Sequence, residues 1–239
     1  ETRQWAPFRK VTAMKKIILY SLTTVLIIFA LFIVYGFASP VPVALLIRRS
    51  FQTGTEVTRE SYDEALAQVI QINDLDYHSA YRKGTLDIIT PRQATQKLPV
   101  IIWVHGGGFV GGDKRDIPGY AVVNMNYQLA PEAKYPTPLL QLEEAYNYIK
   151  QNADQLQFDM NNVFFAGDSA GAQIVSQFLL IQTDSSYSAF INIRPSVDPT
   201  TIRGALLYCG PYNIRAFVNI KGTFGFLLGR MAWSYTGLT

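Results

Sequence analysis

The chain has 239 residues, of which 49% are hydrophobic and 16% are charged, so it can bury a substantial core and is not an intrinsically disordered protein. Residues 1–16 hold five basic residues and one acidic residue, which leaves 16 basic against 17 acidic residues in the remainder and argues against a general nucleic-acid-binding surface. The single cysteine, Cys209, excludes an internal disulfide and a thiolate metal cluster. With two histidines and no zinc-binding spacing, we expect neither a metal nor another cofactor.

An apolar segment at residues 17–38 contains no charged side chain and is long enough to cross a bilayer, which takes about 20 residues. The basic flank at 1–16 predicts a cytoplasmic N-terminus, and therefore a cell-membrane protein whose main domain lies outside the cytoplasm. Gly36-Phe37-Ala38 has the form of a signal-peptidase site, and cleavage after Ala38 would give a secreted protein. We favour a retained anchor because the apolar run exceeds the roughly 7–15 residues usual in a signal peptide.

Met14 resembles an ordinary translation start, so we expect that residues 1–13 are not functional sequence. The region 39–75 is expected to join the apolar segment to the main domain, with a stiff, proline-containing linker at 39–42. Apolar residues at helical spacing predict a helix over 58–70. We then expect an antiparallel hairpin, with strands at 76–81 and 85–90.

Buried strands that alternate with helices predict an α/β fold with a mostly parallel sheet and flanking helices over residues 76–239. The expected strands lie at 99–104, 121–127, 163–166 and 201–208, and the expected helices at 136–151 and 172–181. The connection 112–120 contains Pro118 and Gly119, which oppose a crossover helix. We therefore expect one face of the sheet to be partly uncovered and the isolated chain to be marginally stable.

The sequence Gly167-Asp168-Ser169-Ala170-Gly171 lies between an expected strand and an expected helix. A G-x-S-x-G motif in that setting is a nucleophile elbow, in which a tight turn exposes the serine hydroxyl above the sheet. The two glycines let the strand and the helix approach each other. Ser169 is therefore our candidate nucleophile, and we expect Asp168 to orient the elbow through hydrogen bonds.

A second motif, His105-Gly106-Gly107-Gly108, directly follows the strand that is expected to end at Val104. Glycines at this place let backbone N–H groups point at a substrate oxygen without side chains in the way, which is how an oxyanion hole is built. We expect His105 to shape this loop and not to act as a base. We interpret His78, the second histidine, as an ordinary surface or core residue.

The two motifs, in this order and at successive strand ends, resemble the α/β-hydrolase superfamily. Within it, HGGG together with GDSAG is similar to the hormone-sensitive-lipase-like carboxylesterases. The segment 126–132 resembles the NYRLAPE sequence of that family, with Gln128 in place of the usual arginine. The resemblance implies that Ser169 attacks an ester carbonyl to form an acyl-enzyme, while the N–H groups of Gly107, Gly108 and Ala170 hold the oxyanion.

In this superfamily the triad acid and then the histidine follow the serine along the chain. No histidine follows Ser169, and the acidic residues after it are Asp184 and Asp198, both before the last expected strand. We interpret residues 76–239 as a partial α/β-hydrolase domain, C-terminally truncated and inactive alone because it lacks the triad acid and histidine. A remnant that lost catalysis is the competing interpretation.

A membrane-anchored serine esterase acting on a small ester substrate is our first hypothesis. The alternatives are a non-catalytic anchored module that binds a ligand or partner, and a serine peptidase on the same fold, which HGGG disfavours. Five apolar residues are candidates for an acyl pocket: Met125, Tyr212, Phe224, Phe226 and Trp233. Substrate identity, acyl length and oligomeric state stay open.

Overall fold

The computed structural model describes residues 6–52, 67–114 and 122–238 of the chain. The chain divides into two compact units, Glu1–Pro42 and Val43–Thr239, and each is described by itself. In the first unit, helix α1 (Ala6–Ala38) contains the predicted apolar segment. Its part Ala13–Ala38 has a mean hydropathy of 2.8 and no buried side chains, so it is long and apolar enough to span a membrane, a property that signal sequences share.

A helix that the sequence analysis did not predict, α2 (Val41–Gln52), begins inside the expected linker at 39–42. Pro42 is compatible with it because a proline in the first turn of a helix removes no intrahelical hydrogen bond. Ala44 is fully buried and Ile47 packs against the core. The prediction of a linker at 39–42 is therefore wrong for Val41 and Pro42, which are helical.

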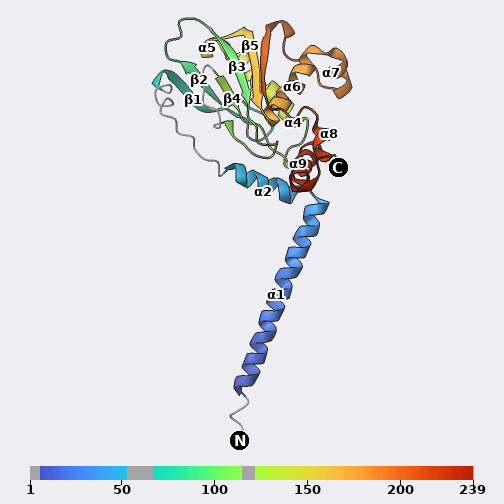
Figure 1. Ribbon diagram of the computed structural model, residues 1–239. Coiled ribbons are helices and arrows are strands. Elements are labelled where there is room, and N and C mark those ends of the chain that lie inside the picture. Colours follow the sequence, from blue (N-terminus) through green and yellow to red (C-terminus); the bar gives the residue numbers. More distant parts are fainter. Residues whose placement is uncertain (1–5, 53–66, 115–121, 239) are drawn as a thin grey trace. The chain divides into compact units, whose positions relative to one another are not determined.

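The second unit is built on one mixed six-stranded sheet with the order β1-β2-β4-β3-β5-β6 (Figure 1). The four strands β4, β3, β5 and β6 run parallel, whereas β1 and β2 are antiparallel to their neighbours. The strands are β1 (Val69–Asp76), β2 (Thr85–Pro91), β3 (Leu98–Val104), β4 (Val122–Met125), β5 (Phe158–Asp168) and β6 (Ile202–Tyr208). The predicted α/β fold with a mostly parallel sheet is confirmed.

The first strand differs from the prediction. The hairpin exists, but β1 covers Val69–Asp76 instead of 76–81, because the β-branched residues at its start pair with β2. Val69 and Ile70 are therefore not helical, and most of the helix expected over 58–70 lies outside the described residues. Tyr77 follows the strand as a buried loop residue whose hydroxyl donates to the carbonyl oxygen of Asn126 at 2.8 Å.

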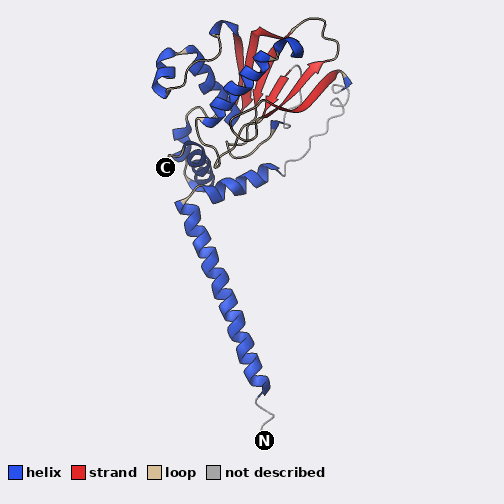
Figure 2. Ribbon diagram, turned by 180° about the vertical axis from the view of Figure 1, so that it is seen from behind, coloured by secondary structure: helices blue, strands red, loops and turns tan. Residues whose placement is uncertain are grey.

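Helices cover the sheet in Figure 2, and α6 packs against β5, β3 and α4. The helices after β4 are α4 (Thr137–Gln151), α5 (Ala153–Leu156), α6 (Ala170–Thr183), α7 (Ser185–Ile191), α8 (Ile214–Val218) and α9 (Gly222–Thr236), with a 3₁₀ turn at Pro199–Thr201. The core between strands and helices includes the fully buried Ile102, Phe165 and Ile174. The crossover predicted without a helix falls mainly on residues 115–121, which lie outside the described part of the chain.

Candidate active site

Ser169 is the single residue between the end of β5 at Asp168 and the start of α6 at Ala170. Its backbone angles are φ 47° and ψ −114°, a conformation that costs a non-glycine residue roughly 1–3 kcal/mol and persists only where the surroundings impose it. The Ser169 N–H donates to the carbonyl oxygen of Tyr208 at 2.7 Å, so the end of β6 holds the turn in place. This is the strained strand–turn–helix arrangement of a nucleophile elbow.

Two glycines allow the elbow to press against the neighbouring strand. A Cβ atom on Gly171 would lie 2.0 Å from the carbonyl oxygen of Val104, the last residue of β3. A Cβ atom on Gly167 would lie 2.7 Å from the carbonyl carbon of Gly171. The first turn of α6 therefore reaches the strand end from which the HGGG loop departs, and no larger side chain fits at either position.

The HGGG loop, here residues 105–114, begins with a turn of positive-φ glycines. Gly107 has φ 99° and Gly108 has φ 60°. The N–H groups of Val110 and Gly111 both donate to the carbonyl oxygen of Gly107, at 3.2 and 2.9 Å. The turn thus leaves the N–H groups of Gly107 and Gly108 without a hydrogen-bond partner among the described residues.

Asp168 connects the two motifs, because its Oδ1 atom accepts a hydrogen bond from the N–H of Gly106 at 3.0 Å. A Cβ atom on Gly106 would lie 2.3 Å from Asp168 Oδ2, which explains the glycine there. His105 is buried and stacks on Tyr127 with ring centroids 4.4 Å apart. The Tyr127 hydroxyl donates to the carbonyl oxygen of His105 at 3.0 Å, and complete burial raises the pKa of Tyr127, which keeps the hydroxyl protonated as a donor.

Ser169 and Gly108 line one mainly apolar cavity of about 90 Å³. Its other walls are Phe109, Cys209, Pro211, Leu228, Met231 and Ala232. Three of these residues lie on α9, and their spacing of three and then one residue is the helical pattern that could have identified them from the sequence. The five predicted pocket residues do not line this cavity; Met125 is instead fully buried in β4, and Phe224 is among the most exposed apolar residues.

Comparison with known proteins now identifies the chain. The profile of the BD-FAE family matches residues 86–221, more than half of the chain, and the match includes both motifs and the Ser169 turn. The chain belongs to the BD-FAE family. It is also 30% identical over 113 residues to a protein of Acanthamoeba polyphaga mimivirus whose name describes it as an α/β hydrolase. The predicted relationship to the α/β-hydrolase superfamily is confirmed.

Solved structures show the same fold for this BD-FAE chain. Esterase B from Lactobacillus rhamnosis has a TM-score of 0.63 at 20% identity, over 81% of this chain and 66% of that one. A thermostable carboxylesterase from a metagenomic library has a TM-score of 0.58 at 20% identity, over 84% of this chain and 68% of that one. The mimivirus match covers 43% of this chain and 33% of the relative, so the BD-FAE chain spans about a third of its curated relative's length.

The acidic residues after the elbow of this BD-FAE chain are helix caps. Asp184 Oδ1 accepts hydrogen bonds from the N–H groups of Ser186 and Tyr187 at the start of α7, at 2.8 and 3.0 Å. Asp198 caps the 3₁₀ turn, and its hydrogen bonds to Thr200 lower the pKa of its carboxyl group. Neither capping role is connected with the chemistry of a triad.

Among the described residues, no side chain is hydrogen-bonded to the Ser169 hydroxyl. His78 is exposed, with Nδ1 3.8 Å from Asp76 Oδ2. His105 is buried, stacks on Tyr127, and has its Nδ1 atom 2.8 Å from the carbonyl oxygen of Gly106. The same described ranges contain no cluster of three or more potential metal ligands.

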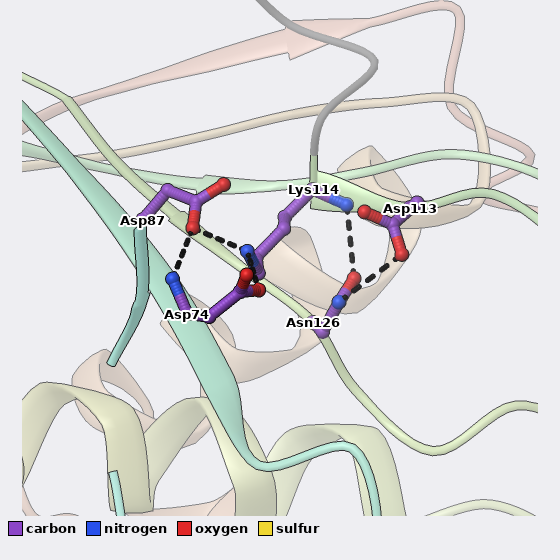
Figure 3. Close-up of polar contacts among 5 residues, drawn as sticks. All are labelled: Asp74, Asp87, Asp113, Lys114 and Asn126. Atoms are coloured by element: carbon purple, nitrogen blue, oxygen red, sulfur yellow. Dashed lines mark hydrogen bonds and ion pairs between the residues drawn. The ribbon is translucent and has the colours of Figure 1, made fainter. Parts of the chain in front are cut away.

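A buried ionic cluster anchors the far end of the HGGG loop (Figure 3). The Lys114 side chain is only 1% exposed, and its Nζ atom donates to Asp87 in β2 and to Asp74 Oδ1 in β1, the latter at 2.8 Å. The Lys114 N–H donates to Asn126 Oδ1 at 2.9 Å, and Asn126 Nδ2 donates to Asp113 Oδ2 at 3.3 Å. The sequence gives no local sign of this cluster, because the residues that each hydrogen bond or ion pair joins are 12 to 40 positions apart along the chain.

Proposed function

We propose that this protein is a serine hydrolase that cleaves carboxylic esters of short or moderate acyl chains through an acyl-enzyme at Ser169. One observation carries the proposal: Ser169 adopts the strained elbow conformation and shares its cavity with the Gly108 backbone. Membership of the BD-FAE family and the fold shared with esterases support the same class of reaction. The apolar walls of the cavity suit the acyl group of an ester.

In the proposed reaction, the Ser169 hydroxyl oxygen attacks the ester carbonyl carbon while a general base takes its proton. The N–H groups of Gly107, Gly108 and Ala170 donate to the oxyanion that forms. Collapse of this intermediate breaks the ester C–O bond, and the protonated base returns its proton to the leaving alcohol. Water then attacks the acyl-enzyme by the same steps, which releases the acid and restores Ser169.

The oxyanion donors are the part of this mechanism best supported by geometry. The turn at Gly107 is closed by two backbone hydrogen bonds, and the N–H groups of Gly107 and Gly108 have no hydrogen-bond partner among the described residues. Preorganised donors of this kind act on charge that develops only in the transition state, and the loss of one donor typically reduces turnover about a hundred- to a thousandfold. We assign neither histidine as the general base, because His78 is exposed and His105 is buried against Tyr127.

We further propose that residues 17–38 anchor the hydrolase domain to the cell membrane on the extracytoplasmic side. The support is the length and hydropathy of helix α1, together with the basic residues that precede it. Alkaline carbonate extraction should leave the natural protein in the membrane pellet. Release into the soluble fraction, with a mature N-terminus at Ser39, would show instead that the segment is a cleaved signal sequence.

A non-catalytic binding module is the second candidate. The observation that favours it is the absence of a hydrogen-bonded base at Ser169 among the described residues. Turnover of p-nitrophenyl acetate by the natural full-length protein, compared with its Ser169→Ala variant, separates the two candidates. The esterase proposal expects turnover that the variant loses, whereas equal background rates in both proteins would support the binding module.

A further inference from the structure

Helix α2 is hydrogen-bonded to the HGGG loop through the side chain of Arg48. Arg48 donates from Nε to the carbonyl oxygen of Val110 at 2.7 Å and from Nη2 to the carbonyl oxygen of Ala130. Its two Nη atoms also bind both carboxylate oxygens of Glu132, at 2.8 and 2.6 Å. Only 18% of the Arg48 side chain is exposed. One guanidinium group therefore joins the loop, the segment after Tyr127 and the helix that precedes the sheet.

The carbonyl group that Arg48 binds belongs to the turn that presents the oxyanion donors. The Val110 N–H donates to the carbonyl oxygen of Gly107, and the Val110 side chain is fully buried. Phe51 of α2 makes a second contact, since a Cβ atom on Gly111 would lie 2.7 Å from Phe51 Cδ2. The helix thus contacts the turn at two consecutive residues, Val110 and Gly111, which are separated by Phe109 from the glycines whose N–H groups have no partner in the described chain.

We infer that Arg48 is a positioning residue for the reaction at Ser169: it fixes the Val110 carbonyl group and so keeps the N–H groups of Gly107 and Gly108 aimed at the oxyanion. This inference rests on the proposed function. A lysine cannot replace Arg48, because one ammonium group lacks the planar fork that reaches two carbonyl oxygens and both oxygens of a carboxylate. The helix that follows the candidate span is then a support of the active site.

Steady-state kinetics of Arg48→Lys in the natural full-length protein test the inference. We expect kcat to fall about tenfold with KM within about twofold, because a displacement of about 1 Å can cost about a hundredfold in rate and oxyanion contacts form only in the transition state. The matched control is Arg49→Lys. Arg49 is the next residue on the same helix and is exposed, and its side chain makes no hydrogen bond or ion pair within the described chain, so its variant should keep wild-type kinetics.

Amide hydrogen exchange provides a readout that does not require activity. In Arg48→Lys, the amides of residues 106–111 should exchange faster than in the wild type, and in Arg49→Lys they should not. If the wild type hydrolyses no ester, the proposed function fails. Faster exchange in Arg48→Lys would still support the conclusion that Arg48 orders the loop. Equal exchange in all three proteins would overturn the inference, as would an unchanged kcat in an active Arg48→Lys variant.

Glu132→Gln is a second test variant, to be used if Arg48→Lys does not fold. This variant keeps the hydrogen bonds from Arg48 to the two carbonyl oxygens but replaces the charged carboxylate that binds its Nη atoms with a neutral amide. We expect kcat to fall about two- to fivefold, with KM unchanged and exchange over 106–111 modestly faster. A lower melting temperature with wild-type kcat and wild-type exchange in this region would mean that Arg48 only stabilises the fold, and would overturn the inference.

Discussion

Arg48 and Lys114 both hold the HGGG loop, and the two sites differ in burial and in the kind of acceptor. Lys114 is buried and binds the carboxylates of Asp74 and Asp87, whereas Arg48 is partly exposed and binds backbone carbonyl groups as well as Glu132. A buried charge that loses its partner is costly, while a partly exposed pair contributes little stability. Stability and catalysis are therefore expected to depend on different ends of the same loop.

The largest stability effect is expected at the Lys114 end. Lys114→Met leaves the Asp87 carboxylate buried without its cation, so the free energy of unfolding should fall by about 3–5 kcal/mol. Urea unfolding measures this change. The double variant Lys114→Met/Asp87→Leu removes both charges and should recover most of the loss. A double variant as unstable as the single one would show that packing, and not the unpaired charge, causes the effect.

A smaller but more selective effect is expected at the elbow. Gly171→Ala places a Cβ atom 2.0 Å from the Val104 carbonyl oxygen, so α6 must shift. We expect about 1–3 kcal/mol of lost stability and about a hundredfold lower kcat from the misplaced serine. Gly204→Ala is the matched control, since its Cβ atom would lie 3.4 Å from the Phe164 ring. If both variants lose kcat equally, the close approach at Gly171 is not what positions Ser169.

The smallest effect concerns the pH dependence of the Arg48 site. The hydrogen bonds from Arg48 lower the pKa of the Glu132 carboxyl group below its ordinary value. The ion pair therefore stabilises the fold above the unfolded-state pKa of glutamate, and this contribution is lost as the pH falls through the lower folded-state pKa. Half of the Glu132 side chain is exposed, so less than about 1 kcal/mol is expected. Urea unfolding between pH 7 and pH 3 should show a shallower decline for Glu132→Gln, and equal slopes would contradict the assignment.

The elbow and the HGGG motif could be predicted from sequence because each is local. Gly167–Gly171 needs only the strand before it and the helix after it, and HGGG needs only the strand that ends at Val104. The apolar runs of β3 and β5 likewise identify buried strands.

The supports of these motifs are long-range, and the sequence gives no local sign of them. Arg48 binds Val110, 62 residues later, and the helix that carries it begins between Pro40 and Pro42, a segment whose prolines predict a linker. The start of β1 differs from the prediction because Val69 and Ile70 also fit a helical spacing, and their pairing with β2 favours the strand. The prediction of marginal stability remains a prediction.

Labelling with a fluorophosphonate tests the nucleophile most directly, because the reagent forms a covalent bond only with an activated serine. In the natural full-length protein, we predict a single labelled peptide that carries the modification on Ser169, and no labelling of Ser169→Ala. Ester turnover that persists in Ser169→Ala, or labelling of a different residue, would contradict the assignment of Ser169 as the nucleophile.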